Sequence, residues 1–123
     1  MGYPGRSAAL AAERRSVRRR YRQLKHFFIS ETTILDPAWL ADYTQHVPPL
    51  VESFGGSYFA RAGEVALLEG EGEAPQFYSI LSFPTREAAK EFYNSPEYEP
   101  YKRARQAGAR SRILIVSWDE TES

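Results

Sequence analysis

The sequence predicts an α+β domain of the ferredoxin-like type, in which the order β-α-β-β-α-β builds a four-stranded antiparallel sheet. Two helical segments, residues 36–54 and 85–110, alternate with short apolar segments. The apolar segments are rich in β-branched and aromatic residues, which are typical of strands. Hydrophobic residues make up 42% of the 123 residues, which favours one packed domain over global disorder.

The first strand is expected at residues 26–35 and the first helix at residues 36–54. The strand segment is aromatic and β-branched, and it ends at Asp36 and Pro37. Asp36 is suited to cap a helix whose first position is a proline. Apolar residues then recur at steps of three and four, which predicts one inward helix face. This face contains Leu40, Tyr43, Val47, Leu50 and Phe54.

Two further strands are expected after a Gly-Gly pair that ends this helix. Ser57–Ala60 and Val65–Glu69 are interpreted as one strand interrupted near Arg61–Gly63, or as a short hairpin. The acidic, glycine-containing segment Gly70–Pro75 is typical of a polar turn. Phe77–Phe83 is the next strand.

The second helix is expected in two parts, followed by the last strand. The first part contains the pairs Ala88–Ala89 and Phe92–Tyr93, and Asn94–Pro96 ends it and starts the second part. Pro100 has no amide hydrogen, so the second part re-initiates or kinks near this residue. Residues 112–118 form the last strand.

Both faces of the predicted sheet are apolar. In the last strand Ile113 and Ile115 point to one face, whereas Leu114, Val116 and Trp118 point to the other. Helices cover only one face in this architecture, and leaving one large side chain in water forfeits roughly 1.5–3 kcal/mol. We therefore expect a second copy of the sheet to cover the other face, which gives a two-fold homodimer or a higher homo-oligomer.

Residues 1–25 form a basic arm in front of the expected barrel domain, residues 26–123. The first 30 residues contain eight Lys and Arg against Glu13 alone, whereas the remainder is acidic. Apolar residues recur in the arm at helical spacing, which predicts a helix. A solvated helix against its own acidic body or a neighbouring subunit is the favoured interpretation. Nucleic-acid binding, contact with anionic lipid and a cleaved targeting segment are the disfavoured alternatives.

Several classes of protein are disfavoured by what the sequence lacks. There is no cysteine, which excludes disulfides, a thiol nucleophile and a thiolate metal site. No glycine-rich phosphate loop, nucleophile elbow or paired histidine with metal spacing is present, so we expect neither a cofactor nor a metal site. No apolar run reaches the roughly 18 residues that span a bilayer. A cytoplasmic location is expected.

His46 is the candidate catalytic residue, and Tyr43 is a candidate ligand-binding residue on the same helix. His46 shares a helix face with Asp42, so it could act as a general base beside a pocket. The alternative is a surface histidine on the flank of the helix. Tyr43 lies in the inward stripe, where its hydroxyl faces a cavity or its ring is simply part of the core.

Three other residues are candidate ligand-binding residues. Arg61 lies beside a glycine at the strand break, where it could reach an anionic group; the alternative is a surface ion pair. Tyr98 and Arg105 share one face of the last helix with Tyr101, which makes an aromatic and basic edge. Packing is the favoured role of that edge, because aromatic residues at helical spacing are usually part of a core.

The chain resembles the family called domain of unknown function 1330, in the dimeric α+β barrel superfamily. The resemblance covers about residues 26–119 and implies a barrel-forming dimer. Relatives in the wider superfamily include cofactor-free monooxygenases, haem-degrading enzymes and lyases, so it implies no single reaction. Gln76 and Ser82 depart from the family, which often has an arginine and a glutamate there. The matching pieces are Asp36-Pro37, Tyr43, Pro48, Gly55-Gly56, Arg61-Ala-Gly63, Leu68-Glu-Gly70, Phe83-Pro84, Ala88-Ala89, Tyr93, Ser95-Pro-Glu-Tyr98 and Arg105.

The leading hypothesis is a small homodimer that binds a small, partly apolar or anionic molecule between the first helix and the sheet. Tyr43, His46 and Arg61 would contact the ligand, and cofactor-independent acid/base or oxygenase chemistry would be the reaction if there is one. A pocket larger than about 300 Å³ at these residues would support this hypothesis. The alternative is a non-catalytic assembly module whose arginine-rich arm contacts nucleic acid or a protein partner.

Overall fold

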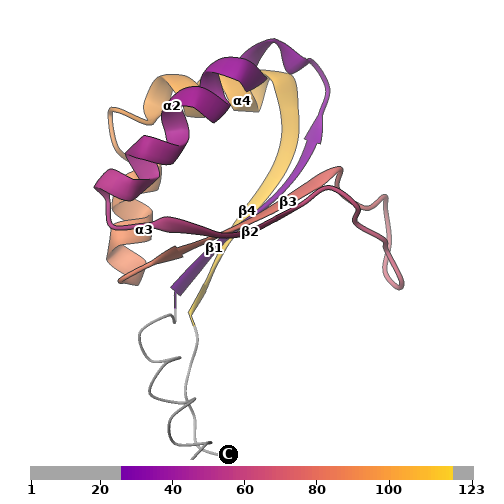
Figure 1. Cartoon of the computed structure of the whole chain (residues 1–123). Helices are drawn as coiled ribbons and strands as arrows, with labels where there is room; N and C mark the ends of the chain where they lie inside the picture. The colour runs from indigo at the N-terminus through magenta and orange to yellow at the C-terminus, as the bar shows by residue number, and fades with distance from the viewer. Residues whose placement is uncertain (1–25, 118–123) are drawn as a thin grey trace, which may run out of the picture.

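The computed structural model describes residues 26–117, which form a ferredoxin-like α+β domain (Figure 1). The predicted basic helix of residues 1–25 and the last residue of the predicted final strand, Trp118, lie outside the described residues. The predicted element order is confirmed. In chain order the elements are β1 (His26–Ile34), the 3-10 helix η1 (Pro37–Trp39), α2 (Leu40–Ser53), β2 (Ser57–Ala62), β3 (Phe77–Phe83), α3 (Arg86–Tyr93), α4 (Glu99–Gly108) and β4 (Ala109–Ser117).

The four strands of this range form one antiparallel sheet in the order β2-β3-β1-β4. Phe28 of β1 lies opposite Leu81 of β3 and Ile115 of β4, so these three side chains share one face. The helices α2, α3 and α4 all lie on that face (Figure 1). The core is built between the helices and the sheet, and its buried members are Phe28, Val47, Val51, Leu81, Phe83, Ala89, Phe92 and Tyr98.

The first helix begins and ends where the sequence predicts. The carboxylate of Asp36 accepts a hydrogen bond from the amide of Ala38 at 3.0 Å, and Pro37 opens the first turn. Both satisfy the requirements of a helix start. After Ser53 the chain turns at Gly55, whose φ of 83° lies in the left-handed region that glycine adopts without strain.

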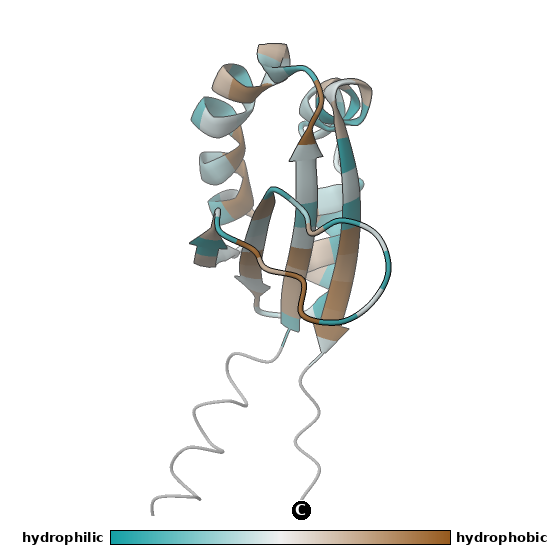
Figure 2. Ribbon diagram, turned by 90° about the vertical axis from the view of Figure 1, so that its right-hand side faces the viewer, coloured by the Kyte–Doolittle hydropathy of each residue, from teal (hydrophilic) through white to brown (hydrophobic). Residues whose placement is uncertain are grey.

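The predicted continuation of the second strand, Val65–Glu69, is wrong. The strand β2 ends at Ala62, which lies opposite Tyr78 near the beginning of β3. Because β3 begins only one residue before Tyr78, Phe77 is the last residue that could pair beyond Ala62, and no residue of β3 remains to pair with Val65–Glu69. The segment 63–76 contains no strand, and it extends away from the sheet on the side opposite the helices (Figures 1 and 2).

The second helix has two parts, as predicted. Thr85 caps α3 by accepting a hydrogen bond from the amide of Ala88 at 2.9 Å. Ser95 then accepts one from the amide of Tyr98, and α4 starts at Glu99 rather than at the Ser95 cap. The strand β4 starts three residues earlier than predicted. Its first residue pairs with the last residue of β1, so the chain enters the sheet directly from the end of α4.

Candidate functional site

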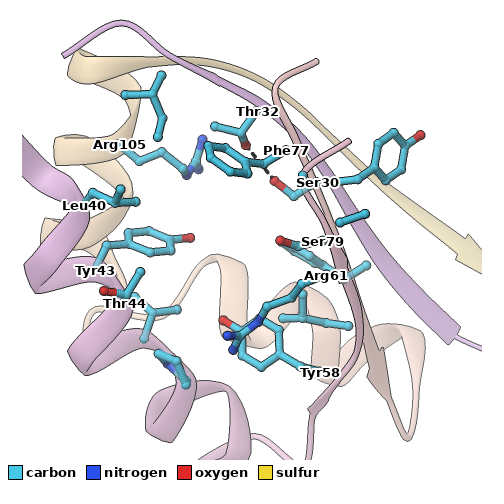
Figure 3. A pocket seen from close by; sticks show the side chains of 18 of the residues that line it. Ser30, Thr32, Leu40, Tyr43, Thr44, Tyr58, Arg61, Phe77, Ser79 and Arg105 are labelled. Carbon is cyan, nitrogen blue, oxygen red and sulfur yellow. Dashed lines mark hydrogen bonds between the residues drawn. The ribbon is translucent and has the colours of Figure 1, made fainter. Parts of the chain in front are cut away.

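A cavity of about 450 Å³ lies between α2 and the sheet (Figure 3). Its volume exceeds the lower limit of about 300 Å³ for a small-molecule site, and it has the mixed apolar and polar lining of such sites. The helix side contributes Trp39, Leu40, Tyr43, Thr44, Val47 and Pro48, and the sheet contributes Phe28, Ser30, Thr32, Ile34, Tyr58, Arg61, Phe77, Ser79 and Leu81. Phe92 and Arg105 reach the same cavity from α3 and α4.

Small side chains in the middle of the sheet leave this space open. The inward residues of β1 change from the aromatic Phe28 to Ser30 and Thr32. Ser30 lies opposite Ser79 of β3, so two small side chains meet at the level where α2 passes over the sheet. The hydroxyl groups of Ser30 and Thr32 lie 3.1 Å apart and are hydrogen-bonded. The sheet wall of the cavity is therefore polar at its centre.

Two tyrosines join α2 to the segment that precedes α4. The hydroxyl groups of Tyr43 and Tyr98 are hydrogen-bonded at 2.5 Å. Tyr98 is fully buried, whereas Tyr43 points into the cavity (Figure 3). Burial raises the pKa of Tyr43 well above its ordinary value, and the neighbouring Tyr98 raises it further. Tyr43 therefore presents a neutral hydroxyl group to the cavity at physiological pH.

Arg105 is a buried cation on the cavity wall. Its side chain is only 4% exposed, and its Nε and Nη2 atoms have no hydrogen-bond partner among residues 26–117. Burial disfavours the charge, but the oxygens of Tyr98 and Tyr43 outweigh this effect and raise the pKa of Arg105. The guanidinium group is therefore charged. The indole Nε1 of Trp39, also buried on this wall, likewise has no partner in the described range.

Arg61 reaches the cavity from the edge strand β2. Its Cζ atom lies 4.0 Å from the centre of the Tyr58 ring, which is a cation–π arrangement. Burial raises the pKa of Tyr58, and the nearby charge of Arg61 offsets part of this rise. Unlike Arg105, Arg61 is exposed to solvent. The two arginines approach the cavity from different elements, α4 and β2 (Figure 3).

His46 does not line the cavity. It lies on an exposed side of α2, where its ring stacks on Tyr101 with the ring centres 5.7 Å apart. Its Nε2 atom is 3.8 Å from the carboxylate of Asp42, one helical turn earlier. His46 is therefore on the flank of the helix, which was the alternative interpretation of its position. Its catalytic role stays a prediction.

The structure brings together three of the five residues proposed from the sequence. Tyr43, Arg61 and Arg105 line one cavity, and Tyr98 supports it from behind through Tyr43. Residues missed by sequence reasoning are Ser30, Thr32, Ser79 and Trp39; polar residues at alternate positions of an inward strand face were the available signal. Within residues 26–117, no group of His, Asp or Glu could hold a metal ion, and no helix is long and apolar enough to cross a membrane.

The family named domain of unknown function (DUF1330) matches residues 25–118. The chain belongs to the DUF1330 family. The match covers all the residues that the structure describes, so the domain with its cavity lies within the family region and the basic arm lies almost wholly outside it. A comparison with curated proteins finds no match.

Several solved structures share the fold of this domain. The DUF1330 domain is similar to RPA0582, a protein of unknown function from Rhodopseudomonas palustris, with a TM-score of 0.66 and 19% identity over 89% of this chain and 94% of that one. SnoaB, a cofactor-independent oxygenase from Streptomyces nogalater, gives a TM-score of 0.55 and 15% identity over 80% and 96%. HapK from Hahella chejuensis gives 0.52 and 12% over 80% and 96%. These likenesses concern the fold alone.

Proposed function

We propose that this DUF1330 protein binds a small, partly apolar organic molecule in the cavity between α2 and the sheet. The single observation that carries the proposal is the size and lining of the cavity: about 450 Å³, with apolar walls and a few polar groups that converge on it. A space of this size between a helix and a sheet departs from the usual density of protein interiors.

Native mass spectrometry of the purified protein tests this proposal, because a co-purified ligand appears as an added mass. Calorimetric titration with 1-naphthoate and with its neutral amide, 1-naphthamide, is the second measurement. In the variant Ser79→Phe an aromatic ring fills the cavity from the middle of the sheet, so we expect it to abolish binding of both probes. Gln45→Phe adds the same ring at an exposed position of α2 and is the control. If neither probe binds and no added mass is found, the proposed function is wrong.

A reaction in this cavity is a second candidate function. It is favoured by the likeness of fold to SnoaB, a cofactor-independent oxygenase, and by the neutral Tyr43 hydroxyl that reaches the cavity. Against it stands the position of the predicted base, His46, which lies outside the cavity lining. Oxygen uptake that requires an added hydroxylated aromatic acid and disappears in Ser79→Phe would support this candidate. Ligand binding without any turnover would contradict it.

We also propose that two copies of the chain associate through the face of the sheet that the helices leave uncovered. Phe59, Leu114 and Val116 are 59%, 38% and 43% exposed on this face. Phe27 and Ile29 of β1 lie opposite Val116 and Leu114, so the apolar side chains are contiguous across neighbouring strands. An apolar patch of this kind on a soluble domain marks an association surface.

The segment between β2 and β3 supports the same association. Leu67 and Leu68 are 46% and 95% exposed, and the segment that carries them extends from the side of the uncovered face (Figure 2). At the centre of the face Glu31 accepts a hydrogen bond from Tyr78 at 2.9 Å and lies 4.0 Å from Arg112. Polar groups that satisfy one another in this way can be buried by a partner at a lower cost than unpaired ones.

A further inference from the structure

We infer that the ligand of the α2–sheet cavity is a monocarboxylate with a compact apolar body, and that Arg105 binds its carboxylate group. This inference rests on the proposed function, and it adds the chemical class and the orientation of the ligand. The carboxylate would lie at the α4 end of the cavity, and the apolar body would lie between α2 and the sheet.

The charges around the cavity favour an anionic ligand. Among the described residues, those that line the cavity include two arginines and no aspartate, glutamate or histidine. Arg105 is 4% exposed, and no carboxylate of residues 26–117 forms an ion pair with it. A buried cation is normally paired, because removing it from water is costly. An anionic ligand supplies the missing partner.

The geometry of the unpartnered donors of Arg105 favours a carboxylate. The Nε and Nη2 atoms lack hydrogen-bond partners in the described range, and these two nitrogens share one edge of the planar guanidinium. That edge matches the two oxygens of a carboxylate in a bidentate pair. Both nitrogens are buried, so the carboxylate would reach them with a local shift of the atoms that cover them.

The charges on the cavity lining limit the ligand to one negative charge. Arg105 is the buried cation of the cavity, whereas Arg61 is exposed and its guanidinium lies over the Tyr58 ring. The other polar groups near the cavity centre are the uncharged hydroxyls of Ser30, Thr32 and Tyr43. One buried guanidinium balances a carboxylate, whereas a phosphate dianion would keep an uncompensated buried charge.

A further hydrogen-bond donor and the apolar walls of the cavity define the rest of the ligand. Trp39 packs against Gly108, one helical turn after Arg105, and its buried Nε1 atom is also unpartnered in the described range. It is a second donor on the same wall of the cavity. The remaining walls are apolar, with Phe28, Val47 and Leu81 among them. These walls fit a compact hydrophobic body better than a sugar or a peptide.

The test compares two probes of the same shape, 1-naphthoate and the neutral 1-naphthamide, by calorimetric titration of the full chain. Hydrogen bonds to a charged group are stronger than neutral ones by an amount that corresponds to about tenfold or more in affinity. We therefore expect 1-naphthoate to bind at least about tenfold more tightly than the amide. Equal binding of the two probes would overturn the inference and leave the proposed function intact.

Variants assign the preference to Arg105. In Arg105→Gln we expect the two probes to bind equally. In Arg105→Lys we expect a reduced preference for 1-naphthoate, because the charge remains but the two nitrogens on one edge of the guanidinium are lost. Arg103→Gln is the matched control, since Arg103 lies on the same helix, is 77% exposed and pairs with Glu99. Trp39→Phe removes the second donor together with part of the ring, and the lost ring affects both probes alike, so the substitution should weaken 1-naphthoate more than 1-naphthamide. It also keeps the test usable if Arg105→Gln does not fold. An unchanged preference in both variants would contradict the inference.

Discussion

At the scale of single residues, the hydrogen bond between Tyr43 and Tyr98 is the polar contact that fixes the cavity wall. Each hydroxyl is the other's partner at 2.5 Å, and Tyr98 is fully buried. Removing one hydroxyl leaves the other in the core without a partner. Burying a hydroxyl group without a partner costs more free energy than the hydrogen bond contributes, because the hydration lost on folding is not replaced.

Tyr43→Phe should therefore lower the free energy of unfolding by about 1–2 kcal/mol. Urea denaturation followed by circular dichroism measures this change. The double variant Tyr43→Phe/Tyr98→Phe should cost less than the sum of the two single changes, because neither hydroxyl is then left alone. Tyr101→Phe is the control, since that hydroxyl makes no hydrogen bond within residues 26–117. Additive costs of Tyr43→Phe and Tyr98→Phe would show that the two residues are not coupled.

The same pair predicts how stability depends on pH. Burial and Tyr98 raise the pKa of folded Tyr43 well above the unfolded value of about 10. A raised pKa of this kind contributes stability that is fully present below the unfolded pKa and is lost as the pH rises through the folded one. Alkaline titration of tyrosinate absorbance should show a late-ionising component that Tyr43→Phe reduces. Simultaneous ionisation of all tyrosines near pH 10 would contradict this expectation.

The sequence indicates part of the site at this scale. The helical stripe places Tyr43 inward, and the positions of Arg61 and Arg105 beside a strand break and on a helix face made them candidates. His46 follows Tyr43 by three residues, which is enough rotation to move it from the inward face to the exposed flank. That Arg105 has no ion-pair partner within residues 26–117 could not be predicted, because ion pairing depends on residues far away in the chain.

At the scale of elements, the joint between η1 and α4 holds the closed end of the cavity. Gly108 ends α4, and a Cβ atom there would lie 2.8 Å from both the Asp36 carbonyl oxygen and the Trp39 Nε1, and still closer to the Trp39 Cδ1. The same glycine carbonyl accepts hydrogen bonds from the amides of Leu35 and Asp36 at 2.9 Å. The position therefore allows no side chain.

Gly108→Ala should destabilise the domain by about 1–3 kcal/mol, because the added methyl group overpacks a joint that includes backbone atoms. Thermal unfolding measures the change. Gly63→Ala is the matched control, since its Cβ would meet only the Phe77 ring at an ordinary 3.7 Å, and we expect a change within about 0.5 kcal/mol. Equal effects of the two substitutions would contradict the proposed packing of Trp39.

Element order and most element boundaries follow from the sequence because they depend on local signals. The cap at Asp36, the cap at Thr85 and the steps of three and four along α2 all have local physical causes. The prediction of a strand at Val65–Glu69 is wrong for a non-local reason. Its apolar residues resemble a strand, but β3 has no residue left to pair with them.

At the scale of the whole molecule, the sequence predicts that the sheet has a second apolar face, and the structure leaves that face uncovered by its own helices (Figure 1). The proposed dimer is the consequence. Leu114→Glu places a charge within the apolar patch of this face, so we expect this variant to be a monomer in sedimentation velocity at micromolar concentration, and we expect the wild type to be a dimer. Leu35→Glu changes an exposed leucine outside the sheet and should leave the dimer intact. A monomeric wild type would contradict the proposal.

The cavity joins these scales, since it is lined by small residues on two strands, a tyrosine pair and an arginine that has no ion-pair partner within residues 26–117. A crystal structure of the full chain grown with 1-naphthoate tests this account most directly. The account predicts the naphthalene ring between α2 and the sheet, with its carboxylate against the guanidinium of Arg105. A collapsed cavity, or a probe bound only elsewhere on the protein, would contradict it.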